Sequence, residues 1–203
     1  ITAEKNEAER QRLMAAFGGK GHFDDLKEVA RKGDKLWVAR EAMFPVSESP
    51  LMPNIPGKSL LGNQTDLEAL SKGKKASLVT FAFTALGEPH VKSYLTPFQV
   101  EFDGTPDVAI VQYNVEEDWA KQWAVKMFEP WIRRKIPEAM RSNYLIHLGD
   151  ISVDRNRIGM GNKLLGWVHL VDSSGRVRWS AHGPAKEGEI KTLIDSTKLL
   201  LKQ

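Results

Sequence analysis

The hydrophobic pattern of the C-terminal third predicts two adjacent β-strands and a terminal helix. Residues 167–171 form an apolar run, 172–175 read Asp-Ser-Ser-Gly, and Val177 and Trp179 resume a spacing of two. Such a pattern is typical of a strand, a tight turn and a second strand. After Gly183-Pro184, apolar residues return at helical spacing: Ile190, Leu193, Ile194 and Leu201.

Two earlier apolar runs, 78–83 and 107–113, predict buried strands, and 144–148 predicts a weaker one. A helix is expected to start near His90, with Pro89 in its first turn. Asn114 is predicted to cap a second helix whose first turn carries acidic residues. The resulting order of βαβ then ββα around a central mixed sheet is typical of an α/β, thioredoxin-like domain.

The first 44 residues are polar with short apolar stripes, so they predict a helical N-terminal extension. The stripes are Leu13, Met14 and Phe17, then Phe23, Leu26, Val29 and Ala30, then Leu36, Trp37, Ala39 and Met43. Four prolines between residues 45 and 56 indicate an extended linker. Residues 57–203 are therefore expected to form the thioredoxin-like domain.

The chain has 203 residues, a formal net charge of +3 and no cysteine. No run approaches the roughly 18 apolar residues that predict a membrane-spanning helix. A thioredoxin-like site needs thiols where its first central strand turns into a helix, and Leu86 and Pro89 stand there. The loop at 164–166 also lacks the usual proline. Thiol redox catalysis, disulfides and thiolate metal sites are thus excluded.

Other chemistry has little support in the residue pattern. Glu88 and His90 offer a carboxylate and an imidazole for acid–base work, but the favoured interpretation is that Glu88 stabilises a helix start and His90 is exposed. His169 is expected to be a packing residue. Gly159 to Lys163 lacks the spacing of a phosphate-binding loop. Several basic residues are interspersed with acids, so nucleic-acid binding is not expected: Arg133, Arg134, Lys135, Arg141, Arg155 and Arg157.

The second predicted helix is unusually aromatic, and we expect it to bind a partner. Trp123 and Met127 are predicted to cover the sheet, and Pro130 to bend or end the helix. The remaining apolar surface, with basic residues around it, would form a partner-binding or membrane-surface patch. The predicted contact residues are Trp119, Phe128, Trp131, Arg133 and Arg134.

The block from Asn162 to Trp179, with Ile55-Pro56-Gly57-Lys58-Ser59-Leu60 and the strand at 78–83, resembles a known family. That family comprises the fungal mitochondrial assembly factors for the Fo sector of ATP synthase. The resemblance runs from about Phe44 to the C-terminus. Its distinctive positions are Asn162, Gly166, Asp172, Gly175, Arg178 and Trp179. Some members carry a cysteine just after the arginine–tryptophan pair, where this chain has 180–183, Ser-Ala-His-Gly.

The resemblance implies a non-enzymatic chaperone with no cofactor. Its members lie on the matrix side of the inner membrane, as peripheral proteins. They bind newly made subunit a of ATP synthase before that subunit joins the proton-carrying ring. A transit peptide would precede Ile1 and be removed. Two alternatives stay open: a peroxiredoxin-like enzyme that lost its cysteine and uses Glu88 and His90, and a subunit of a mitochondrial ribonucleoprotein.

Overall fold

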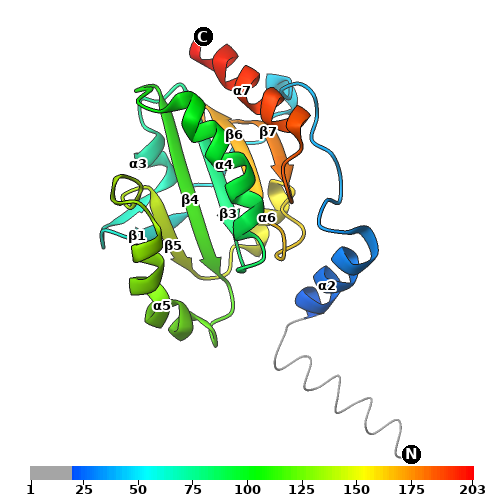
Figure 1. Cartoon of the computed structure of the whole chain (residues 1–203), viewed down its shortest axis with the longest axis vertical. Helices are drawn as coiled ribbons and strands as arrows, with labels where there is room; N and C mark the ends of the chain where they lie inside the picture. Colours follow the sequence, from blue (N-terminus) through cyan, green and yellow to red (C-terminus); the bar gives the residue numbers. More distant parts are fainter. Residues whose placement is uncertain (1–19) are drawn as a thin grey trace, which may run out of the picture.

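The computed structural model describes residues 20–203, which fold around one seven-stranded mixed sheet (Figure 1). The strand order is β2-β1-β5-β4-β3-β6-β7. The strands are β1 (Pro56–Ser59), β2 (Gln64–Asp66), β3 (Ala76–Ala82), β4 (Val108–Glu116), β5 (Tyr144–Leu148), β6 (Trp167–Asp172) and β7 (Val177–His182). The α-helices are α2 (Lys20–Lys32), α3 (Leu67–Ser71), α4 (Glu88–Phe102), α5 (Gln122–Lys135), α6 (Ser152–Arg157) and α7 (Glu187–Leu201). Short 3₁₀ helices are η1 (Val46–Glu48) and η2 (Glu138–Met140).

The central strand β3 has only buried residues because it has a neighbour on each side and helices over both faces. It pairs in parallel with β4 and antiparallel with β6. The predicted hairpin is β6 and β7, with Gly175 at φ +76° in its turn. Helices α4 and α7 cross the near face of the sheet in Figure 1, over Leu78, Val168 and Trp179.

The opposite face of the sheet is covered by α3, α6 and the loop that follows α6. Their Leu67, Ile151 and Met160 pack with Phe81 and Trp167. A third, smaller cluster joins α5 to the β1 and β5 edge. The sheet therefore has a layer on each side, and α5 lies at the margin of one of them (Figure 1).

The start of α5 differs from the prediction. Asn114 is not a helix cap, because β4 continues to Glu116 and pairs there with β5. The helix begins only at Gln122 and runs through Pro130 to Lys135, so proline does not end it. The pairing of β4 with β5 decided the boundary, and a local capping signal cannot report it.

The segment before β1 also differs in part from the prediction. Within the described residues, α2 ends at Lys32, and residues 33–44 contain no helix. The stripe containing Leu36 and Ala39 instead runs extended along the domain, and Ala39 is buried. The first predicted stripe, residues 13–17, lies outside the described part of the chain. Residues 45–56 are largely extended, and their division from the domain stays a prediction.

Candidate partner-binding surface

Helix α5 rests on the domain by one narrow apolar stripe. Its Val125 and Ile132, with Ile136 just beyond its end, pack against Leu60 and Tyr144. No residue of α5 is fully buried, whereas α4 and α7 each bury five. Because α5 contacts the domain through so few residues, most of its surface is exposed to solvent.

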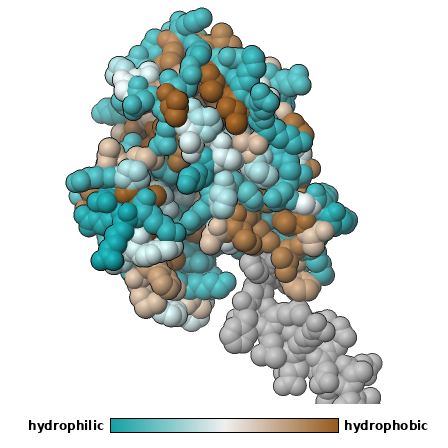
Figure 2. Space-filling model, viewed as in Figure 1, coloured by the Kyte–Doolittle hydropathy of each residue, from teal (hydrophilic) through white to brown (hydrophobic). Residues whose placement is uncertain are grey.

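The exposed circumference of α5 and its N-terminal turn is aromatic. Trp119 is 83% exposed, Trp123 64% and Trp131 54%, and Met127 and Phe128 are also more than half exposed. We call these five residues the aromatic surface. Figure 2 shows pale and tan residues over the lower part of α5. A run of large exposed apolar side chains on one element is typical of a binding surface.

The structure corrects the prediction for two of these residues. Trp123 and Met127 were expected to cover the sheet, but both side chains are more than half exposed. The stripe of Val125 and Ile132 packs against the sheet edge instead. The expected exposed residues Trp119, Phe128 and Trp131 do lie in solvent.

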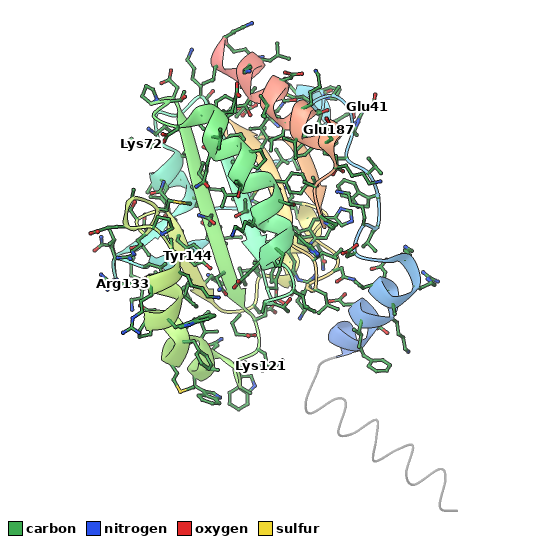
Figure 3. All side chains as sticks on the ribbon, in the orientation of Figure 1. Glu41, Lys72, Lys121, Arg133, Tyr144 and Glu187 are labelled. Atoms are coloured by element: carbon green, nitrogen blue, oxygen red, sulfur yellow. The ribbon has the colours of Figure 1, made fainter. Side chains whose placement is uncertain are left out.

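Positive charge borders the aromatic surface. Arg133 and Arg134 are exposed near the helix end (Arg133 is labelled in Figure 3), and Lys126 lies about two turns earlier. None of these three forms an ion pair with a residue in the described range 20–203. Lys135 Nζ lies 3.4 Å from the ring centroid of Trp131, a cation–π contact. The helix carries one carboxylate, Glu129, which pairs with Lys58 at 3.0 Å. The rim of the aromatic surface is therefore cationic.

The position of a thioredoxin-type active site is closed by backbone contacts. Gly166 lies against the start of α4, where an added Cβ would overlap the Gly87 carbonyl oxygen. Gly166 N–H donates to His90 Nδ1 at 3.3 Å. His90 Nε2 lies 3.7 Å from Asp34. Burial lowers the pKa of His90, with the charge of Asp34 acting in the opposite direction. Glu88 is exposed and the structure does not bring it into contact with His90.

A buried polar cluster lies beside this closed position, and its member Lys35 was not predicted from the sequence. Lys35 Nζ donates to Tyr94 Oη at 2.7 Å, to the His182 carbonyl at 2.7 Å and to Glu189 Oε2 at 2.6 Å. The Tyr94 hydroxyl also donates to Glu189, at 2.7 Å. Glu189 is detectable in part, as the third residue of α7, where a glutamate can accept the backbone N–H of the residue before the helix; it accepts that of Lys186 at 3.0 Å.

Burial and hydrogen bonding set the charges in this cluster. Burial lowers the pKa of Lys35, while the bond to Glu189 raises it. Burial would raise the pKa of Glu189, but the bonds from Ala39 N–H, Lys35 and Lys186 N–H hold it below its usual value. The carboxylate therefore stays ionised and fixes the extended segment at residues 35–39 to α7.

The block from 162 to 179 connects the N-terminal segment to the sheet. Asn162 is fully buried and its amide donates to the Asp25 carbonyl at 3.0 Å. Trp179 Nε1 donates to the Arg40 carbonyl at 2.8 Å. Arg178 Nε donates to the Phe44 carbonyl at 3.2 Å, and its Nη1 pairs with Asp172 at 3.2 Å. In the structure these four side chains thus have packing and anchoring contacts.

The predicted basic residues do not form one surface. Arg155 pairs with Glu117 at 3.1 Å, and Arg141 Nε donates to the Ile136 carbonyl. His169 is fully buried with Nδ1 2.8 Å from Ser180 Oγ, so it is the packing residue expected. Across residues 20–203, no group of acidic or histidine side chains is placed to hold a metal ion. No helix of that same range is long and apolar enough to cross a membrane.

The class of protein follows from the sheet order and from similar solved structures. BsSco, described as a member of the Sco family of cytochrome c oxidase assembly proteins, aligns with a TM-score of 0.53 at 17% identity. The alignment covers 80% of this chain and 99% of that one. A DsbF homologue from Corynebacterium diphtheriae aligns with a TM-score of 0.51 at 13% identity, over 76% and 90% of the two chains. At such identities the likeness shows the fold alone, which is thioredoxin-like, as predicted.

The family is defined by sequence. Residues 1–200 match the family described as ATP10 protein, and the chain belongs to that family. A Schizosaccharomyces pombe relative named probable mitochondrial ATPase complex subunit atp10 is 29% identical, over 95% of this chain and 70% of its own length. The Saccharomyces cerevisiae mitochondrial ATPase complex subunit ATP10 is 27% identical, over 98% and 76%. The resemblance stated from the sequence is thereby confirmed.

Proposed function

We propose that this protein is a non-enzymatic assembly factor of the mitochondrial ATP synthase. It binds newly made subunit a on the matrix side of the inner membrane, before that subunit joins the proton-carrying ring. The names of the relatives support a role with the mitochondrial ATPase complex. The absence of cysteine supports a binding role, since a thioredoxin-like frame without thiols has no nucleophile for redox exchange.

The observation that carries the proposal is the aromatic surface. Five large apolar side chains are more than half exposed, four on α5 and Trp119 just before it, and α5 itself has no buried residue. Their exposure is costly in water, and a partner that covers them gains the free energy of burial. A membrane subunit that is not yet assembled also exposes apolar surface, and it likewise gains free energy when a partner covers that surface. Lys126, Arg133 and Arg134 at the rim would steer and orient a client with acidic groups.

Capture of nascent chains tests this proposal. Tagged protein is cross-linked in mitochondria labelled for organellar translation products, and the captured products are identified. We expect selective recovery of subunit a with the wild type. Recovery should fall at least about tenfold in a variant with Trp119, Phe128 and Trp131 changed to Ser, since aromatic residues dominate binding energy.

A matched control separates loss of binding from loss of fold. Val153 and Leu199 are also exposed apolar residues, on α6 and α7, and Val153→Ser with Leu199→Ser should leave capture unchanged. Thermal unfolding of both variants should match the wild type, because none of the changed residues is buried. Undiminished capture by the α5 variant, also with Arg133 and Arg134 changed to Ala, would reject this surface.

A further inference from the structure

A cleft lies between α4 and α5, over the middle of the sheet. It encloses about 520 Å³. A second cavity of about 770 Å³ shares four of its residues and continues along β4. Gln99 Nε2 and Met140 Sδ, 2.9 Å apart, lie among the shared residues. The walls are largely apolar: Val91, Leu95, Ile136, Pro137 and Met140. An elongated hollow of this kind fits a peptide segment better than a compact molecule.

The floor of the cleft is polar. Thr80 on β3, Gln112 on β4 and Tyr144 on β5 are neighbours in the strand register and all line the cavity (Tyr144 is labelled in Figure 3). Gln112 is only 7% exposed, yet its side-chain amide has no hydrogen-bond partner among the described residues. The amide faces the cavity and is free to hydrogen-bond a group that enters it.

The chemistry of the floor selects an uncharged ligand group. A carboxamide and a hydroxyl each donate and accept hydrogen bonds, and Gln112 and Thr80 present these groups to the cleft. Burial raises the pKa of Tyr144 by more than the hydrogen bond from Asn114 lowers it, so its hydroxyl stays neutral. An ionised ligand group would lose its hydration with no opposite charge on the floor. The charged residues that line the cleft, Glu88, Lys92 and Lys135, are of both signs and none of them is on the floor.

We propose that this cleft receives an uncharged hydrogen-bonding side chain, a carboxamide or a hydroxyl, carried on an apolar peptide segment. Gln112 is its principal partner, and Thr80 the second. The cleft adjoins the aromatic surface, since Lys135 lines the cleft and lies over the ring of Trp131. One segment can therefore cover both. The inference rests on the proposed function only in taking a polypeptide client as the occupant.

Synthetic peptides test the cleft without the natural client. The probes are labelled Leu/Ala peptides with aspartate at both ends and one central guest residue: Leu, Asn or Glu. Fluorescence anisotropy with the full chain measures each Kd. We expect the Asn peptide to bind roughly three- to tenfold more tightly than the Leu peptide, as one new hydrogen bond predicts. The Glu peptide should bind no better than the Leu peptide.

Gln112→Leu should abolish the preference for Asn while leaving affinity for the Leu peptide unchanged or higher. Thr80→Val should reduce the preference, and Gln64→Leu, on the edge strand β2 outside the cleft, should preserve it. Equal binding of the Asn and Leu peptides by the wild type would overturn the proposal, and so would an unchanged preference in Gln112→Leu. Nascent subunit a captured by Gln112→Leu at the wild-type level would support the assembly role and reject the cleft as its site.

Discussion

The buried carboxylate of Glu189 accepts hydrogen bonds from three separate parts of the chain. Lys35 and Ala39 come from the extended segment, Tyr94 from α4, and Lys186 from the start of α7. Such a group contributes to stability only while its partners remain, because an unpaired buried charge is strongly destabilising.

Removing the charge of Glu189 should therefore destabilise the fold. Glu189→Gln leaves the Lys35 ammonium without its counter-ion, and we expect the free energy of unfolding to fall by about 3 kcal/mol. Glu187→Gln, two residues away and exposed, should change it by less than about 0.5 kcal/mol. Urea unfolding measures both, and equal effects of the two changes would contradict the importance of the cluster.

Protonation of His182 should lower the free energy of unfolding in mild acid. Burial lowers its pKa to about 4, with the charge of Lys35 acting in the same direction. Its Nε2 accepts the Leu36 N–H at 2.9 Å, so protonation there breaks this bond. The unfolded chain has the ordinary value near 6.5. Stability is thus complete above about pH 6.5 and decreases as the pH falls toward 4.

Burial lowers the pKa of His169 to about 3, so the protonation of this residue also destabilises the fold as the pH falls. The free energy of unfolding should decrease by up to about 1.4 kcal/mol per pH unit for each histidine. Urea unfolding at pH 7, 6 and 5 measures the slope, which His182→Gln should reduce. A slope unchanged in this variant would show that His182 does not titrate on unfolding.

At the scale of elements, α5 differs from the other long helices. Its apolar stripe is short and its aromatic surface faces outward. The sequence predicted an aromatic helix with a wide apolar arc, and this prediction is right in composition. It assigned the wrong residues to the sheet, because the arc is nearly continuous and helical periodicity cannot then choose the buried side.

Hydrogen exchange should distinguish α5 from α4. Amide protons open locally where few apolar contacts hold an element, and α5 has no buried residue against five in α4. We expect protection in α5 to be at least about tenfold lower than in α4 in the free protein. Saturation with the Asn peptide should raise protection in α5. Equal protection of both helices would show that α5 is not a weakly held element.

At the scale of the whole molecule, the segment before β1 covers the free edge of the sheet. The last strand, β7, has a neighbour only on one side in the sheet order. Phe44 N–H donates to the Arg178 carbonyl, and Val177 N–H donates to the Pro50 carbonyl. An uncovered edge strand exposes unpaired backbone groups and favours aggregation. The N-terminal segment therefore completes the sheet.

Truncation tests this dependence. Removal of residues 1–44 deletes Lys35 and the carbonyl acceptors for Arg178 and Trp179. We expect Tm to fall by roughly 10 °C, with a greater tendency to aggregate. A stable protein without its first 44 residues would contradict the role assigned to the segment.

The sequence by itself determined the strands at the core, the hairpin and the terminal helix, because each depends on a local pattern of apolar and turn residues. It also determined that no thiol chemistry is possible, since the chain has no cysteine. Only the tertiary structure decided what depends on distant pairing. In the folded chain Lys35 pairs with Glu189, 154 residues away. Trp123 faces solvent, and Gln112 lines a cleft without a side-chain hydrogen bond to a described residue. Contacts of this kind depend on how elements meet, which periodicity along one element does not encode.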